Sequence, residues 1–166
     1  MKLDFHFTTH NEFIKNIFSL KKFEIEDVID KVQINLYSID SFRSYWFNEI
    51  DRVYGSDIDL LVFLRMRIFK LNPGQVFYIN SQEVYAYLKG ECLELMTNSD
   101  NMIRAGLTVR YIDKGEMLRF GRFEEGIFSL LRGENLDGFN VFNLPGINLS
   151  LFQRYIDGKI YFKEIV

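Results

Sequence analysis

Hydrophobic side chains recur every three to four residues through the first 55 positions, and this spacing predicts helices. Thr9 and Glu12 have the spacing of a capping box, which marks the start of the first helix. Gly55 tolerates the backbone of a helix end. We therefore expect a helical region over residues 1–55, in which apolar stripes include the segments 13–18, 25–32 and 42–50.

After Gly55 the spacing changes to two, which is typical of strands. Alternate apolar residues between Ile58 and Phe69 predict one long strand, and the Asn72-Pro73-Gly74 turn predicts that it joins a second strand. We expect a β domain over 56–166, with a helix near 115–132 that Gly121 and Gly126 weaken. Its further predicted strands lie at 75–79, 84–88, 91–96 and 159–166.

The composition of the chain indicates a folded domain and argues against nucleic acid or a membrane as its partner. A hydrophobic fraction of 48% in 166 residues indicates a folded domain, and a net charge of −3 argues against nucleic acid as a partner. The sequence has no run of about 20 apolar residues, so we expect no membrane partner. Cys92 is the single cysteine, and we interpret it as a small buried side chain. With no disulfide framework and no apolar secretory signal, a cytoplasmic location is expected.

Polar residues within the predicted β segments are the candidates for chemistry. Tyr85 and Tyr87 share one face of a predicted strand, and Glu94 stands among apolar neighbours on the next. A carboxylate that faces inward needs a partner or a task, because its desolvation is costly. The polar stretch 98–101 then leads to Arg104. We expect Asp100 and Asn101 to hold the turn through bonds to the backbone.

Four short motifs lie between about Tyr54 and Met117: Asn72-Pro73-Gly74, Ala86-Tyr87-Leu88-Lys89-Gly90-Glu91-Cys92, Ser99-Asp100-Asn101 and Arg104-Ala105-Gly106-Leu107-Thr108. Through these motifs, this stretch closely resembles the active-site half of type I phosphomannose isomerases, which are members of the cupin superfamily. The resemblance implies an α+β fold in which the N-terminal helical segment precedes an incomplete cupin-like antiparallel β-barrel or sandwich. It also implies zinc-dependent interconversion of mannose 6-phosphate and fructose 6-phosphate, which supplies GDP-mannose.

The zinc ligands that the resemblance implies are not recognisable in this sequence. The family uses a Gln-x-His pair, a Glu and a further His, whose position Tyr85 occupies here. Every Gln in the chain is followed two residues later by a residue other than His. A phenol with an ordinary pKa of about 10 is a poor zinc ligand. His6 and His10, spaced i, i+4, are more simply read as exposed residues before a helix. We therefore expect no metal site and no zinc in this chain.

The resemblance assigns roles to the matched residues that remain. Tyr87, Glu94 and Arg104 fall at the family's active-site tyrosine, glutamate and arginine, and Arg110 replaces a substrate-side lysine. Isomerisation through an enediolate requires proton transfer and a cation for the developing oxyanion. The catalytic candidates are thus Arg104, Glu94 and Tyr87, and the substrate-binding candidates are Arg104 and Arg110. The structural alternatives are a Glu94–Arg104 ion pair, a core Tyr87 and a solvated Arg110.

Three interpretations stay open. In the first, the chain is a mannose-6-phosphate isomerase-like protein that is inactive alone, either as a pseudoenzyme or as an incomplete gene product. In the second, it is a non-catalytic cupin-like module that binds a phosphosugar or a protein. In the third, a complementing chain completes its site. Open strand edges and its many aromatic residues also predict self-association.

Overall fold

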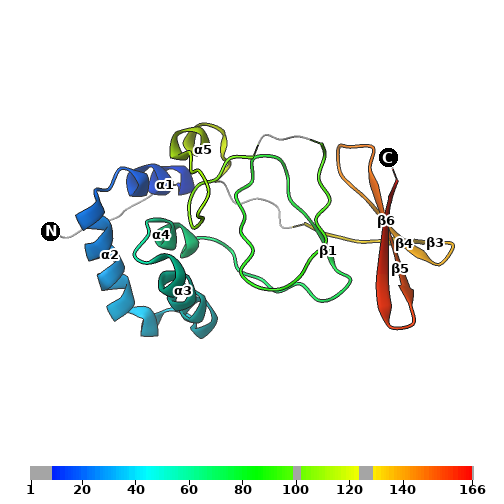
Figure 1. Cartoon of the computed structure of the whole chain (residues 1–166), viewed down its shortest axis with the longest axis horizontal. Coiled ribbons are helices and arrows are strands. Elements are labelled where there is room, and N and C mark those ends of the chain that lie inside the picture. The colour runs from blue at the N-terminus through cyan, green and yellow to red at the C-terminus, as the bar shows by residue number, and fades with distance from the viewer. Residues whose placement is uncertain (1–8, 99–101, 124–128, 166) are drawn as a thin grey trace. The chain divides into compact units, whose positions relative to one another are not determined.

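The computed structural model describes residues 9–98, 102–123 and 129–165 (Figure 1). The chain is α+β, as predicted: N-terminal helices are followed by antiparallel sheets, and within the described residues these sheets do not close into a barrel. It forms two compact units, Met1–Ile68 with Gln82–Glu125, and Phe69–Ser81 with Gly126–Val166. The predicted division at residue 55 stays a prediction.

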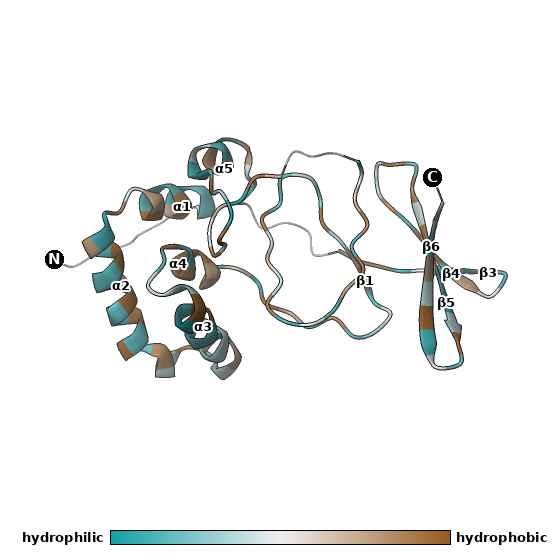
Figure 2. Cartoon of the chain, in the orientation of Figure 1, coloured by the Kyte–Doolittle hydropathy of each residue, from teal (hydrophilic) through white to brown (hydrophobic). Residues whose placement is uncertain are grey.

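The predicted helices of the first 55 residues are confirmed. Helix α1 (His10–Phe18) begins after Thr9, whose hydroxyl accepts a hydrogen bond from the Glu12 amide at 3.2 Å. It is followed by α2 (Lys22–Ile34), the short 3-10 helix η1 (Leu36–Ser38) and α3 (Ser41–Tyr54). Gly55 follows α3 with a φ of 72°, the left-handed backbone for which glycine is favoured. Figure 2 shows hydrophobic and hydrophilic colours alternating along α2 and α3, as expected of amphipathic helices.

The core of the first unit lies between these helices and α4 (Asp59–Phe63). Ile29, Phe47 and Leu60 are completely buried there. Two residues from the segments that carry the family resemblance, Leu88 and Leu107, pack against this core. Those segments, described over residues 82–98 and 102–113, are called the motif segment below.

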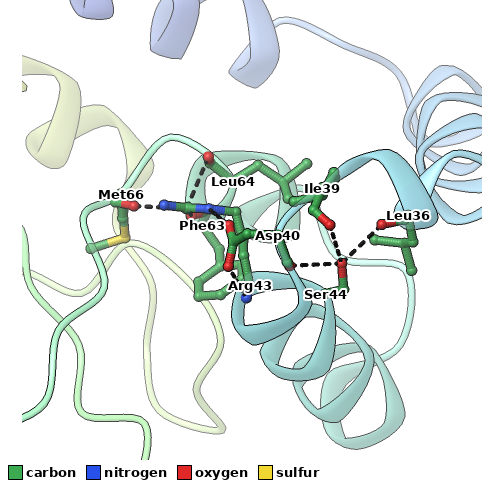
Figure 3. A network of polar contacts seen from close by, with 8 residues as sticks. All are labelled: Leu36, Ile39, Asp40, Arg43, Ser44, Phe63, Leu64 and Met66. Carbon is green, nitrogen blue, oxygen red and sulfur yellow. Dashed lines mark hydrogen bonds and ion pairs between the residues drawn. The ribbon is translucent and has the colours of Figure 1, made fainter.

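The predicted strand between Ile58 and Phe69 is wrong, because α4 occupies its first half. Ile58, Asp59, Leu60 and Leu61 are all buried, whereas a strand with one covered face would bury alternate residues. Arg43 of α3 fixes the end of α4: its Nη1 donates to the carbonyl oxygens of Phe63, Leu64 and Met66 at 3.1, 3.0 and 2.8 Å (Figure 3). Tertiary packing and this arginine therefore override the period-two pattern.

In the second unit, the turn at 72–74 is confirmed by the bond from the Gln75 amide to the Asn72 carbonyl at 3.0 Å and by a φ of 85° at Gly74. Strand β1 (Val76–Tyr78) follows it and pairs antiparallel with β2 (Ser129–Leu131). Residues 69–71 before the turn form no strand. The turn therefore leads into one strand rather than joining two.

A four-stranded antiparallel sheet completes the second unit, in the order β3 (Glu134–Leu136), β4 (Phe139–Asn143), β5 (Ser150–Ile156) and β6 (Lys159–Ile165). The final predicted strand corresponds to β6. The other three were not predicted, although Asp137-Gly138 and Asp157-Gly158 are strong hairpin signals. Both pairs adopt positive φ, at 49° and 81° and at 49° and 74°. Gln153 is buried on this sheet and donates to the Gly74 carbonyl at 3.0 Å.

The strands predicted at 84–88 and 91–96 are wrong. Both segments are irregular in the structure, and Figure 1 draws them as loops. A strand requires a hydrogen-bonded neighbour, and the described pairing here is one isolated bridge between Glu83 and Arg122. The helix expected near 115–132 is shorter than predicted: α5 spans Lys114–Phe120 and ends before Gly121, while Gly126 lies outside the described residues.

Candidate functional site

Two tyrosines and a glutamate meet in the motif segment. The Tyr85 hydroxyl donates to Glu94 Oε1 at 2.8 Å, and the Tyr85 and Tyr87 rings lie edge to face with centroids 5.5 Å apart. The chain reverses between them at Gly90, whose φ is 125°. Leu88 anchors this loop on the helical core. The structure thus brings together the candidate residues Tyr87 and Glu94 and the residue at the family's histidine position.

The surroundings of Tyr85 and Tyr87 favour the protonated form of both phenols. Partial burial, followed by the hydrogen bond and charge of Glu94, raises the pKa of Tyr85 above its usual 10. Burial first and Glu94 second also raise the pKa of Tyr87. Both phenols are therefore neutral near pH 7. A neutral phenol beside a carboxylate donates a hydrogen bond to it, and a protonated phenol is a poor ligand for a metal ion.

The predicted surroundings of Glu94 and Cys92 are wrong. Both residues are exposed, whereas Glu94 was expected to face inward and Cys92 to be buried. The error follows from the missing strands, because without a pleated sheet successive side chains do not alternate between core and solvent. Glu94 takes its hydrogen bond from a phenol in place of an arginine. Within the described residues, no ion pair joins Glu94 to Arg104.

The two candidate arginines lie further along the motif segment. Arg104 is half-buried, and its Nη2 lies 3.2 Å from the sulfur of Met102, a weak acceptor. Its carbonyl accepts from the Asp113 amide at 3.0 Å, which closes a loop before α5. Arg110 is exposed, and its amide donates to the Thr108 hydroxyl at 3.2 Å. Asp100 and Asn101 lie outside the described residues, so their predicted turn role is not tested.

Sequence reasoning missed one charged group beside this loop. Asp59, the first residue of α4, is only 6% exposed, and its Oδ2 has no hydrogen-bond partner within the described residues. Lys114 Nζ lies 3.9 Å from that oxygen. Burial, and secondarily the neighbouring Asp57, raises the pKa of Asp59 to about 7. The available signal was an acidic residue inside the apolar run 58–64.

The described residues do not fit the zinc site that the resemblance implies. The resemblance implies a histidine ligand at position 85, but the residue there is Tyr85, whose neutral hydroxyl donates its hydrogen bond to Glu94. Across residues 9–98, 102–123 and 129–165, no group of three or more His, Cys, Asp or Glu is arranged to hold a metal ion. His10 begins α1, and His6 lies outside these ranges.

Comparisons with known proteins agree with the resemblance. The chain is 32% identical over 146 residues to a probable mannose-6-phosphate isomerase of Caenorhabditis elegans, an alignment that covers 81% of this chain and 34% of that protein. It is 43% identical over 75 residues to the Escherichia coli (strain K12) mannose-6-phosphate isomerase, covering 45% of this chain and 19% of that enzyme. The rat mannose-6-phosphate isomerase is 32% identical over 111 residues, which cover 60% and 26%.

No family model matches the chain, and no solved structure matches it significantly. No helix within the described residues is long and apolar enough to cross a membrane. The chain spans between 19% and 34% of the length of the relatives reported above. Within that limit, the chain is a partial member of the mannose-6-phosphate isomerase family.

Proposed function

We propose that this chain is a mannose-6-phosphate isomerase-like protein that does not interconvert mannose 6-phosphate and fructose 6-phosphate by itself. The observation that carries this proposal is the hydrogen bond from Tyr85 to Glu94 at 2.8 Å. Its donor is a protonated phenol, at the position for which the resemblance implies a metal ligand. In the same proposal, the chain is a pseudoenzyme of carbohydrate metabolism in the cytoplasm and carries no zinc.

Aldose–ketose isomerisation moves a proton between adjacent carbons and develops negative charge on oxygen. Glu94 is exposed and is able to exchange protons with a substrate, and the neutral Tyr87 is a possible hydrogen-bond donor beside it. An electrophilic metal ion would need ligands, and no group of three or more His, Cys, Asp or Glu in the described residues is arranged to hold one. Arg104 is the remaining cation for the oxyanion, and a single guanidinium is a weak replacement for a coordinated divalent ion.

Elemental analysis and a coupled isomerase assay test this proposal directly. We expect much less than one zinc per chain after purification and no turnover with added zinc, with the Escherichia coli enzyme as the positive control. About one zinc per chain together with turnover that Arg104→Ala abolishes would overturn the proposal. Turnover that persists in Arg104→Ala would point to a contaminating isomerase, which a second purification step removes.

A second function, binding of a sugar phosphate, is supported by Arg104. Its guanidinium is a planar fork that binds phosphate oxygens in pairs, and within the described residues its side-chain contact is the weak Met102 sulfur. Arg110 lies nearby in sequence and is exposed. A ligand phosphate would therefore replace a poor acceptor with a strong one.

Thermal unfolding with increasing mannose 6-phosphate tests this binding. We expect a rise in melting temperature that Arg104→Ala abolishes and that Arg52→Ala, an exposed arginine of α3, leaves intact. Mannose and inorganic phosphate, titrated separately, show which half of the ligand is recognised. No shift at millimolar ligand would contradict the binding function without affecting the proposed lack of turnover.

A partner chain, either a second copy or a complementing polypeptide, is also part of this proposal. Its support is the exposure of large apolar side chains in the motif segment, which include Val109 and Tyr111 at 100% and 81% exposed. Light scattering over a range of concentrations measures the mass of the particle. We expect a dimer or larger species, and a stable monomer would count against self-association.

A further inference from the structure

A buried carboxylate with an unused oxygen lies against the loop that carries Arg104. Asp59 is 6% exposed and is followed by the buried Leu60 and Leu61. Its Oδ2 accepts no hydrogen bond within the described residues. An unsatisfied buried oxygen of this kind costs free energy, so its position needs a physical explanation.

Both ends of the Arg104–Lys114 loop meet this oxygen. A Cβ added at Gly106 would lie 1.6 Å from Asp59 Oδ2, so the glycine backbone packs directly on the carboxylate and no larger residue fits. Lys114 Nζ lies 3.9 Å from the same oxygen. The hydrogen bond from the Asp113 amide to the Arg104 carbonyl, at 3.0 Å, joins the two ends of this loop.

The charges that act on Asp59 oppose one another. Its burial and the neighbouring Asp57 favour the neutral acid, whereas Lys114 favours the carboxylate, and the balance raises the pKa of Asp59 to about 7. The neutral acid has no charge to desolvate, so it packs against the Gly106 backbone at a lower cost than the carboxylate does. The ionised form requires solvation, which at this site means moving toward Lys114 or admitting water.

We propose that Asp59 is a positioning residue for the Arg104–Thr108 segment and that its ionisation releases this segment from α4. The proposal rests on the proposed sugar-phosphate function in one respect: release displaces Arg104 and weakens its grip on the phosphate. The Asp59–Gly106 contact itself does not depend on that function. The loop is therefore held in place below neutral pH and loosened above it.

Hydrogen exchange of the amides of residues 105–113 tests the release in the full chain. After correction for intrinsic exchange, we expect protection to fall by about tenfold or more between pH 6 and pH 8.5, the change that one pKa unit of linkage supplies. Asp59→Asn should abolish this fall, and the exposed control Asp30→Asn should retain it. Lys114→Met should move the midpoint to higher pH, because the charge that favours the carboxylate is gone. Equal protection at both pH values in the wild type, or an unchanged fall in Asp59→Asn, would overturn the proposal.

A double-mutant cycle tests the contact independently of pH. Gly106→Ala should reduce protection of the loop, because the new methyl group collides with Asp59 Oδ2. Asp59→Ala in the same chain removes that collision and should restore part of the protection. Strictly additive effects of the two substitutions would show that the residues do not act on each other, and the proposal would fail.

Titration with mannose 6-phosphate at both pH values separates the two proposals. Since the ligand phosphate also ionises in this range, wild type and Asp59→Asn are compared at the same pH. We expect equal affinities at pH 6 and about tenfold weaker binding by the wild type at pH 8.5. A loop transition without any binding would refute the sugar-phosphate function and leave the positioning role standing. Binding with no difference between the two proteins at pH 8.5 would refute the control of Arg104 by Asp59.

Discussion

The helical region and the motif segment differ in how they cover their apolar side chains. In the helices, Ile17, Ile29 and Phe47 are at most 2% exposed and form one cluster with α4. In the motif segment, Leu88 and Leu107 pack on that cluster, whereas Tyr87, Leu93, Met96, Val109 and Tyr111 are more than half exposed. Of these two regions, the motif segment thus buries fewer of its apolar side chains.

This difference indicates that the segment with the family motifs is not the segment that stabilises the fold. Helices satisfy their backbone hydrogen bonds locally and need only one covered face. An irregular segment has neither a local hydrogen-bond pattern nor a single covered face, so its order depends on contacts with the rest of the chain or with a partner. The family motif therefore reports ancestry and candidate chemistry, while the stability of this chain is concentrated in residues outside the motif.

The largest expected effect is the loss of a helical core residue. Phe47→Ala removes a completely buried ring and should lower the free energy of unfolding by about 3–5 kcal/mol. Tyr111→Ala, in the motif segment, should change it by less than about 0.5 kcal/mol because the ring is 81% exposed. Urea unfolding followed by circular dichroism measures both. Similar losses for the two variants would remove the contrast between the regions.

The second effect has the opposite sign and depends on pH. The pKa of Asp59 is raised from 3.8 to about 7, so the folded chain binds the extra proton and its stability falls as pH rises between those values. Asp59→Asn removes this loss and should be more stable than the wild type at pH 8 by on the order of 2–4 kcal/mol. The two proteins should converge near pH 4. A difference that is constant with pH would show that Asp59 does not titrate within the folded chain.

The third effect concerns Arg43 of α3, which donates hydrogen bonds to the carbonyl oxygens at and just after the end of α4. Arg43→Met removes the donor to three carbonyl oxygens and should cost about 2–3 kcal/mol of unfolding free energy. Arg52→Met on the same helix loses one exposed pair with Glu49 and should lower the free energy of unfolding far less than Arg43→Met. Chemical unfolding of both variants at pH 7 gives the comparison. Equal costs would mean that α4 holds its shape without Arg43.

The smallest effect lies within the motif segment. Glu94→Gln removes the negative charge beside both phenols and should lower the pKa of Tyr85 and Tyr87 toward 10, while stability changes by about 1 kcal/mol or less. Ultraviolet titration of the tyrosines reads the pKa values, with Tyr85→Phe and Tyr87→Phe to assign them. An unchanged titration would show that Glu94 does not contact these phenols in solution.

The helices were predictable because their signals are local. The Thr9 cap, the apolar stripes and Gly55 are all read within a few residues, and each appears in the structure as expected. The structure between Ile58 and Phe69 was not predictable in this way. The alternation of apolar residues there competes with burial on every side and with hydrogen bonds from Arg43, which is remote in sequence. The hairpins at Asp137-Gly138 and Asp157-Gly158 were not predicted, although an Asp-Gly pair is a strong signal for this kind of turn.

The candidate site was predictable only as a set of residues. The motifs identified Tyr85, Tyr87, Glu94 and Arg104, but the pairing of Glu94 with Tyr85 in place of Arg104 depends on the irregular path of the loop. Their roles in binding or catalysis stay predictions. Asp59 was not predicted as a site residue because Gly106, which packs on its carboxylate in the folded chain, is distant in sequence.

The connectivity of the four-stranded β3–β6 sheet has a consequence for the order of folding events. Each of its pairings joins strands that are neighbours in sequence, so its contact order is low and little loop-closure entropy opposes it. β1 and β2, in contrast, meet only after the whole motif segment has been spanned. We therefore expect the β3–β6 meander to assemble early and the β1–β2 ladder to form late, during refolding.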